Sequence, residues 1–154
     1  MTVAIRLARR LGIGIFATLV LQGCGHLVVL RDPLTASEHN DLGVSYESAG
    51  EAALAAKQYR KSLQLEPRQS LAWVNLGNLD AATGHWGAAQ KSYRRALRES
   101  STDPDAMNNL AIALFRQGRN PTEARAWAER AVAIGGARDS LYRATLTEVS
   151  SGTR

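Results

Sequence analysis

The sequence of 154 residues lacks features on which several classes of protein depend. Cys24 is its single cysteine, so no disulfide can form within the chain. The longest uncharged apolar stretch, residues 11–21, has eleven residues, about half of what a membrane-spanning helix needs. No glycine-rich phosphate-binding loop follows a strand pattern. A disulfide framework is thereby excluded, and a spanning helix and a phosphate-loop nucleotide site are not expected.

The sequence also lacks a set of residues with catalytic or metal-binding spacing. The three histidines, His26, His39 and His85, are far apart and do not have the spacing of metal ligands. Asp103 and Asp105 are close together, but a helix is predicted to begin there, where negative charge favours the helix dipole. We therefore expect a protein that is not an enzyme, with no cofactor, no bound metal and no small-molecule substrate.

A period of 34 residues is the main feature that is present. Residues 41–43 (Asp-Leu-Gly) return as 75–77 (Asn-Leu-Gly) and again as 109–111 (Asn-Leu-Ala). A fixed period of this size indicates a stack of repeated structural units. A second glycine returns seven residues after the Gly or Ala of each copy, at Gly50, Gly84 and Gly118.

Each repeat is expected to form two helices. In the first helix a residue with little or no side chain (Gly43, Gly77 or Ala111) follows a large apolar one, which lets a second helix approach closely. The second recurring glycine ends that helix. Apolar residues of the second helix fall on one face, with spacings of i, i+4 and i+7. The predicted helices span 36–48, 52–65, 70–82, 86–99, 104–117 and 121–134, with Thr35 and Glu38 in capping-box spacing before the first.

These residues resemble the tetratricopeptide repeat. The first unit supplies Leu42, Gly43, Tyr46, Ala55, Tyr59 and Pro67, and the second supplies Trp73, Leu76, Gly77, Ala89, Tyr93 and Ala96. In the third unit, Ala124 and Ala131 match only with one residue inserted near Asn120 and Pro121. His39 takes the position of Trp73 and Met107, which implies a packing role. The resemblance implies an all-α fold, a right-handed α-solenoid of three repeats over residues 36–136.

A shorter seventh helix is predicted after the repeats. It spans about 138–149 within a capping segment, 137–150, and residues 151–154 form a tail. A solenoid needs such an end cap with a polar outer face. The residues expected to cover the open end of the third repeat are Leu141, Ala144, Leu146 and Val149.

Residues 1–23 have the pattern of an export signal, with basic residues before a short apolar run. Residues 21–24 (Leu-Gln-Gly-Cys) resemble a bacterial lipobox, which implies lipidation of Cys24 as the new N-terminus and a tether over 24–35. Gly25, rather than Asp, follows Cys24 and favours the outer membrane, on its periplasmic face. An inner-membrane protein, an ordinary signal peptide with a secreted product and an uncleaved anchor remain alternatives. The charge of +5 falls to +2 without the three basic residues of the signal, so no nucleic-acid partner is expected.

Proteins of this family bind partners, and the resemblance places the first helix of each pair on a concave face. Asp41, Asn75 and Asn109 stand 34 residues apart, and an amide can donate to and accept from a peptide backbone. Such a ladder and hydrogen bonding within the helices are the two alternatives for these side chains. The family's carboxylate clamp is not expected, because basic residues are missing from its positions. The expected partner-binding residues are Asn40, Asp41, Val44, Asn75, Asn78, Asn108, Asn109, Ile112 and Arg116.

The second helices carry a recurrent basic stripe on the convex face. This stripe is either a solvated surface or a contact for anionic lipid headgroups or an acidic partner. We expect an adaptor or scaffold that binds a protein or peptide partner in the cell envelope and is held to the membrane through Cys24. A structural subunit of an envelope secretion, pilus or polysaccharide-export machine, or an accessory module of an exported peptidase, is the alternative. The stripe consists of Lys57, Arg60, Lys61, Lys91, Arg94, Arg95 and Arg98.

Overall fold

The computed structural model describes residues 32–152, and all the regular structure of this part of the chain is helical. Residues Leu34–Arg154 form a compact unit separate from Met1–Pro33. The predicted signal segment, Cys24 and most of the tether lie outside the described residues. The helices are α2 (Ala36–Ser48), α3 (Ala52–Leu65), α4 (Ser70–Ala82), α5 (Trp86–Glu99), α6 (Pro104–Arg116), α7 (Pro121–Ile134) and α8 (Asp139–Ser151).

The helix ends follow from the residue types placed there. Thr35 and Glu38 form the predicted capping box at α2: the Glu38 carboxylate accepts from the Thr35 backbone N–H at 2.7 Å, and the Thr35 hydroxyl accepts from the Glu38 N–H at 3.3 Å. Asp103 caps α6 through the backbone N–H of Ala106 at 3.1 Å. Past the ends of the first helices, the recurring glycines adopt positive φ at Gly50, Gly84 and Gly118.

Close packing of the two helices in a pair depends on glycine facing a tyrosine ring. A Cβ atom at Gly43 would lie 2.4 Å from Cε1 of Tyr59, and one at Gly77 would lie 2.6 Å from Cε1 of Tyr93. Both tyrosines are buried. The expected close approach is confirmed: the aromatic ring of the second helix occupies the space that a side chain on the first helix would need.

The third pair has alanine on both helices, at the positions of the glycine and the tyrosine of the first two pairs. The interval from the start of α5 to the start of α7 is 35 residues, one more than from α3 to α5, which confirms the inserted residue. It lies in the turn before α7, where Asn120 has a φ of 50° and caps the helix through the N–H of Glu123. Ala128 then occupies the position of Tyr93, opposite a helix that carries Ala111 in place of glycine.

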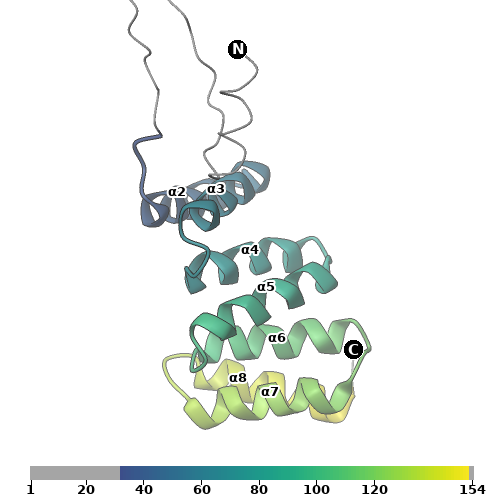
Figure 1. Cartoon of the computed structure of the whole chain (residues 1–154). Coiled ribbons are helices and arrows are strands. Elements are labelled where there is room, and N and C mark those ends of the chain that lie inside the picture. Colours follow the sequence, from purple (N-terminus) through teal and green to yellow (C-terminus); the bar gives the residue numbers. More distant parts are fainter. Residues whose placement is uncertain (1–31, 153–154) are drawn as a thin grey trace, which may run out of the picture. The chain divides into compact units, whose positions relative to one another are not determined.

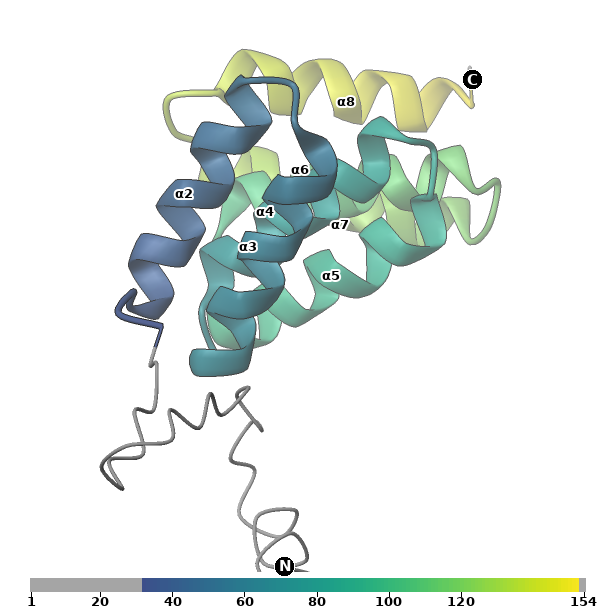
Figure 2. The same ribbon diagram turned by 90° about the horizontal axis from the view of Figure 1, so that it is seen from above.

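The three pairs stack in chain order, as Figure 1 shows. The backbones of α2 and α4 approach each other, as do those of α4 and α6 and of α6 and α8. Among the described helices, the backbones of α3, α5 and α7 do not approach one another. The first helices therefore form the inner face of the stack and the second helices the more widely spaced outer face. Figure 2 shows the stack from above, with α2 and α3 in front of the later pairs.

Helix α8 covers the open end of the third repeat, as predicted, but with a different face. Its buried residues are Tyr142, Thr145 and Val149, whereas Leu141 is 47% exposed and Ala144 is exposed as well. The Tyr142 hydroxyl donates to Asp105 of α6 at 2.7 Å. The expectation for Leu141 and Ala144 was wrong because this tyrosine, rather than the aliphatic residues, fixes the rotation of the helix about its axis.

Candidate functional site

The inner face of α2, α4 and α6 presents a mixture of apolar, amide and acidic side chains. Val44 is 44% exposed and Leu71 is 58% exposed. Asn40 and Asn108, two of the predicted binding residues, are 2% and 1% exposed. Helix packing therefore covers these two amides, which lie beneath the inner face and are not accessible to a partner. We call the accessible surface the inner groove; it consists of Asp41, Val44, Glu47, Leu71, Asn75, Asn78, Ala81, Ala82, Asn109 and Ile112.

The amides of the predicted ladder bridge neighbouring repeats. Asn75 Nδ2 donates to Asn40 Oδ1 on α2 at 2.9 Å, and Asn109 Nδ2 donates to Asn78 Oδ1 on α4 at 3.1 Å. An amide nitrogen carries two hydrogens, so each of these bonds uses only one of them. Asn75 and Asn109 thus join adjacent first helices, and both side chains remain partly accessible in the inner groove.

A hollow of about 340 Å³ lies in the groove between the second and third repeats. The Tyr93 hydroxyl on its wall donates to Asn78 Oδ1 at 3.0 Å, so this oxygen accepts from both Tyr93 and Asn109. Trp86 was not predicted as part of a site, and only its place directly after the Gly84–His85 turn could have indicated it. The hollow is lined by Asn78, Ala81, Ala82, Trp86, Tyr93, Asn109 and Ile112.

Two carboxylates stand at the α2 end of the inner groove. Asp41 and Glu47 are both exposed. The Tyr59 hydroxyl donates to Glu47 Oε2 at 2.6 Å. Burial, followed by this hydrogen bond, raises the pKa of Tyr59 well above its ordinary value, so the hydroxyl stays a donor across the neutral range. The Glu47 carboxylate is therefore held at a fixed place at the edge of the groove.

The polar residues at the other end of the inner face are engaged by the capping helix. Arg116, a predicted partner-binding residue, forms an ion pair with Glu148 of α8 at 2.9 Å. Asp105 accepts from Tyr142 and lies 3.3 Å from Arg138. These contacts place α8 beside α6, where the first helix of a fourth repeat would lie, so Arg116 belongs to the cap as well as to the inner face.

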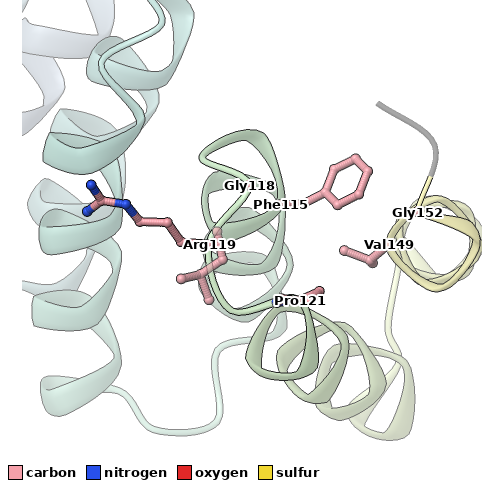
Figure 3. Close-up of a pocket in the computed structure, with 7 residues that line it drawn as sticks. Phe115, Gly118, Arg119, Pro121, Val149 and Gly152 are labelled. Carbon is pink, nitrogen blue, oxygen red and sulfur yellow. The ribbon is translucent and has the colours of Figure 1, made fainter.

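A second, smaller hollow of about 110 Å³ lies between the α6–α7 turn and the end of α8. Figure 3 shows Phe115 directed towards Val149 of α8 and towards Gly152 just past its end, while Arg119 points the other way. Phe115 is 7% exposed and Val149 is 5% exposed. This hollow is part of the packing between the cap and the third repeat.

The basic stripe of the outer face is partly occupied by contacts within the protein. Arg94 on α5 forms an ion pair with Glu123 on α7 at 2.6 Å. The guanidinium of Arg95 lies 5.8 Å from the centre of the Trp73 ring. A hollow of about 220 Å³ between α5 and α7 is lined by Arg94, Leu97, Arg98 and Trp127. Long side chains thus bridge the wider spacing of the outer helices.

The two histidines among the described residues are engaged in contacts within the protein. His39 is buried, as expected, with its Nδ1 2.8 Å from Gln58 Oε1, and the ring of His85 lies 2.9 Å from the Thr83 hydroxyl. Within residues 32–152 no group of three His, Cys, Asp or Glu side chains could hold a metal ion. In the same range no helix has the length and apolar character needed to cross a bilayer.

Comparison with protein families places this helical stack among known repeats. The family model of the tetratricopeptide repeat matches residues 74–140. The Photosystem I assembly protein Ycf3 of Prochlorococcus marinus (strain MIT 9303) is 31% identical over 85 residues, which cover 53% of this chain and 49% of Ycf3. The chain thus spans about half the length of the curated relatives it matches.

Two solved structures share the fold. The first tetratricopeptide domain of Spaghetti (RPAP3), described as bound to the HSP90 peptide SRMEEVD, superposes with a TM-score of 0.71 at 17% identity, over 76% of this chain and 91% of that one. YrrB, described as a tetratricopeptide protein with an unusual peptide-binding site, has a TM-score of 0.68 at 22% identity, over 74% of this chain and 58% of that one. Residues 74–140 thus match the tetratricopeptide-repeat model, and the described part of the chain folds as an all-α solenoid like these two structures.

Proposed function

We propose that this tetratricopeptide-repeat protein is a non-enzymatic adaptor of the bacterial cell envelope. Its inner groove would hold a peptide segment or a helix of a partner protein, and a lipid on Cys24 would keep it at the outer membrane, facing the periplasm. The observation that carries the binding role is the hollow of about 340 Å³ in the inner groove, where apolar walls meet accessible amides. Apolar pockets with a few placed polar groups are the usual form of a binding site.

Both structural neighbours support a peptide as the class of ligand. One is described as bound to a peptide and the other as having a peptide-binding site. Asn78 and Asn109 line the hollow, and Val44 and Leu71 expose apolar surface elsewhere on the inner face. Amides can pair with the backbone of an extended segment while apolar surface holds its side chains.

The envelope location is supported by the sequence alone. The basic residues, the short apolar run and Cys24 fit the export and lipidation pattern. One acyl chain gives only marginal membrane binding, so stable anchoring would need the two or three chains that bacterial lipoproteins carry. The alternative remains a permanent subunit of an envelope machine or an accessory of an exported peptidase, with the outer basic stripe as its interface.

A site-specific crosslink in cells tests the groove. A photoreactive residue at Leu71 (58% exposed, inner face) is compared with one at Leu65 (55% exposed, at the end of outer helix α3). We expect a partner crosslinked from position 71 and lost when Ala82→Arg fills the hollow, while the control Ala133→Arg on α7 leaves it intact. Equal crosslinking from both positions, or indifference to Ala82→Arg, would show that the groove is not the interface.

Labelling with a radioactive fatty acid tests the anchor. We expect the wild-type chain to incorporate the label and to fractionate with the outer membrane, and Cys24→Ser to lose both. Label retained in Cys24→Ser, or a wild-type protein found in the culture medium, would contradict the lipoprotein assignment. Enzymatic turnover by the purified protein that Cys24→Ser leaves unchanged would contradict the adaptor role itself.

A further inference from the structure

Charge is separated between the two faces of the first two repeats. Helices α2 and α4 carry four acidic residues and neither lysine nor arginine. Helices α3 and α5 carry seven basic residues and one acidic residue. The inner side of this half of the stack is therefore negative and the outer side positive, although the chain as a whole is only moderately charged.

Within the inner groove this negative charge is accessible. Asp41 and Glu47 are exposed on α2, and neither forms an ion pair with any residue in the range 32–152. Arg116, the basic residue among the inner positions, is paired with Glu148. The field at the α2 end of the groove is thus that of two carboxylates about two helical turns apart.

An apolar side chain accompanies these carboxylates on the inner face. Val44 lies between Asp41 and Glu47 in the sequence of α2 and is 44% exposed. The hollow then offers the Trp86 ring and Ile112 as apolar walls, with the amides of Asn78 and Asn109 beside them. A ligand that crosses the groove therefore meets negative charge first, then apolar surface, then an apolar cavity with amides.

We propose, building on the peptide-binding role above, that the occupant is an extended segment with a basic side chain at α2 and a large apolar side chain in the hollow. Packed helices lie about 8–10 Å apart, so the path from α2 to the hollow between α4 and α6 is about 14 Å. An extended chain advances about 3.3 Å per residue, so the two side chains are about four residues apart.

The same arrangement disfavours the acidic class of peptide. The ligand of the Spaghetti domain, SRMEEVD, carries three acidic side chains near its C-terminus. Here the α2 end of the groove presents Asp41 and Glu47, and like charges repel. Specificity would then depend on a repulsive element as well as an attractive one.

Selection of a phage library of random peptides on the full chain, purified in mild detergent, tests the proposal. We expect enriched sequences in which Lys or Arg stands about four residues from a large apolar residue. Synthetic copies are then measured by fluorescence anisotropy against Asp41→Asn and Glu47→Gln, which preserve shape and leave an acceptor for Tyr59. Each substitution should weaken binding by about two- to fivefold, an effect that shrinks as salt is raised.

Two controls separate this inference from the proposed function. Glu129→Gln, on outer helix α7, should leave affinity unchanged, and Ala82→Arg should abolish binding. The enriched peptides could lose binding to Ala82→Arg but be acidic or uncharged, and bind Asp41→Asn and Glu47→Gln as tightly as the wild type. That result would overturn the charge inference and leave the groove as the binding site. If Ala82→Arg weakens the binding of none of the enriched peptides, the charge inference and the proposed groove-binding function are both overturned.

Discussion

The substitution Gly77→Ala tests how the helix pairs hold together. The new Cβ would lie 2.6 Å from Cε1 and 2.9 Å from Cδ1 of Tyr93, whereas ordinary contact begins at 3.4 Å. The ring would have to move by about 0.8 Å, the difference between 3.4 and 2.6 Å. It has little room to do so, because Tyr93 is 2% exposed and its hydroxyl is bound to Asn78 at 3.0 Å.

Two opposing effects decide the magnitude. Overpacking a buried site typically costs about 1–3 kcal/mol, and the fixed ring places Gly77 in the upper part of that range. Alanine in place of glycine in a helix gains up to about 1 kcal/mol. We therefore expect Gly77→Ala to lower the free energy of unfolding by about 1–2 kcal/mol, with weakened packing of α4 on α5.

Urea denaturation followed by far-ultraviolet circular dichroism measures the effect, with Gly87→Ala as the matched control. Gly87 is also helical, but its added Cβ would meet only the Gln117 side chain at 3.8 Å, so this variant should be as stable as the wild type or more stable. In a Tyr93→Ala background, which by itself costs about 3–5 kcal/mol, Gly77→Ala should no longer destabilise. If Gly77→Ala matches Gly87→Ala in stability, the ring contact does not limit this position.

Three further predictions concern stability. Burial, then a hydrogen bond to Asp105, raises the pKa of Tyr142 to about 12, and burial also raises the pKa values of Tyr59 and Tyr93 above their ordinary value of 10. A raised folded-state pKa stabilises the fold below the unfolded value, so the urea midpoint should fall as pH rises from 10 towards 12. In a Tyr46→Phe variant, which keeps these three of the four tyrosines, tyrosinate absorbance that appears near pH 10 without loss of helix would contradict this. Asp103→Ala removes the α6 cap and should cost about 1 kcal/mol in the same denaturation assay, while Asp103→Asn should retain most of it. Asn120→Ala loses a cap yet keeps a positive φ, so it should destabilise by more than Asn120→Gly, and equal melting temperatures for the two would count against strain at this turn.

Much of the fold could be read from the residues in order. The 34-residue period with its turn glycines placed all six repeat helices to within one residue, because each boundary is set by a local cause such as the Thr35 cap or the positive φ of Gly84. The inserted residue before α7 was also visible, since Ala124 and Ala131 are out of phase by one. Local conformational preference and periodic apolar spacing are properties of the chain itself.

The candidate site could be predicted only in outline. Equal spacing suggested that Asp41, Asn75 and Asn109 were comparable groove residues, but contacts between repeats use one amide hydrogen of Asn75 and one of Asn109. Packing also buried Asn40, another predicted binding residue. Only its place after the Gly84–His85 turn distinguished Trp86, which forms a wall of the hollow. The neighbouring repeat decides which part of a side chain remains accessible. The angle between repeats sets that contact, and sequence spacing does not report this angle.

The sequence by itself determined the helices, their pairing and the positions where glycine must face an aromatic ring, because these depend on residues close together in the chain or one period apart. Tertiary structure alone decided the face of α8 that is buried, where Tyr142 reaches Asp105 across 37 residues. It also decided the hollow beside Asn109. Those features arise where neighbouring units meet, and the curvature of the stack brings their side chains together.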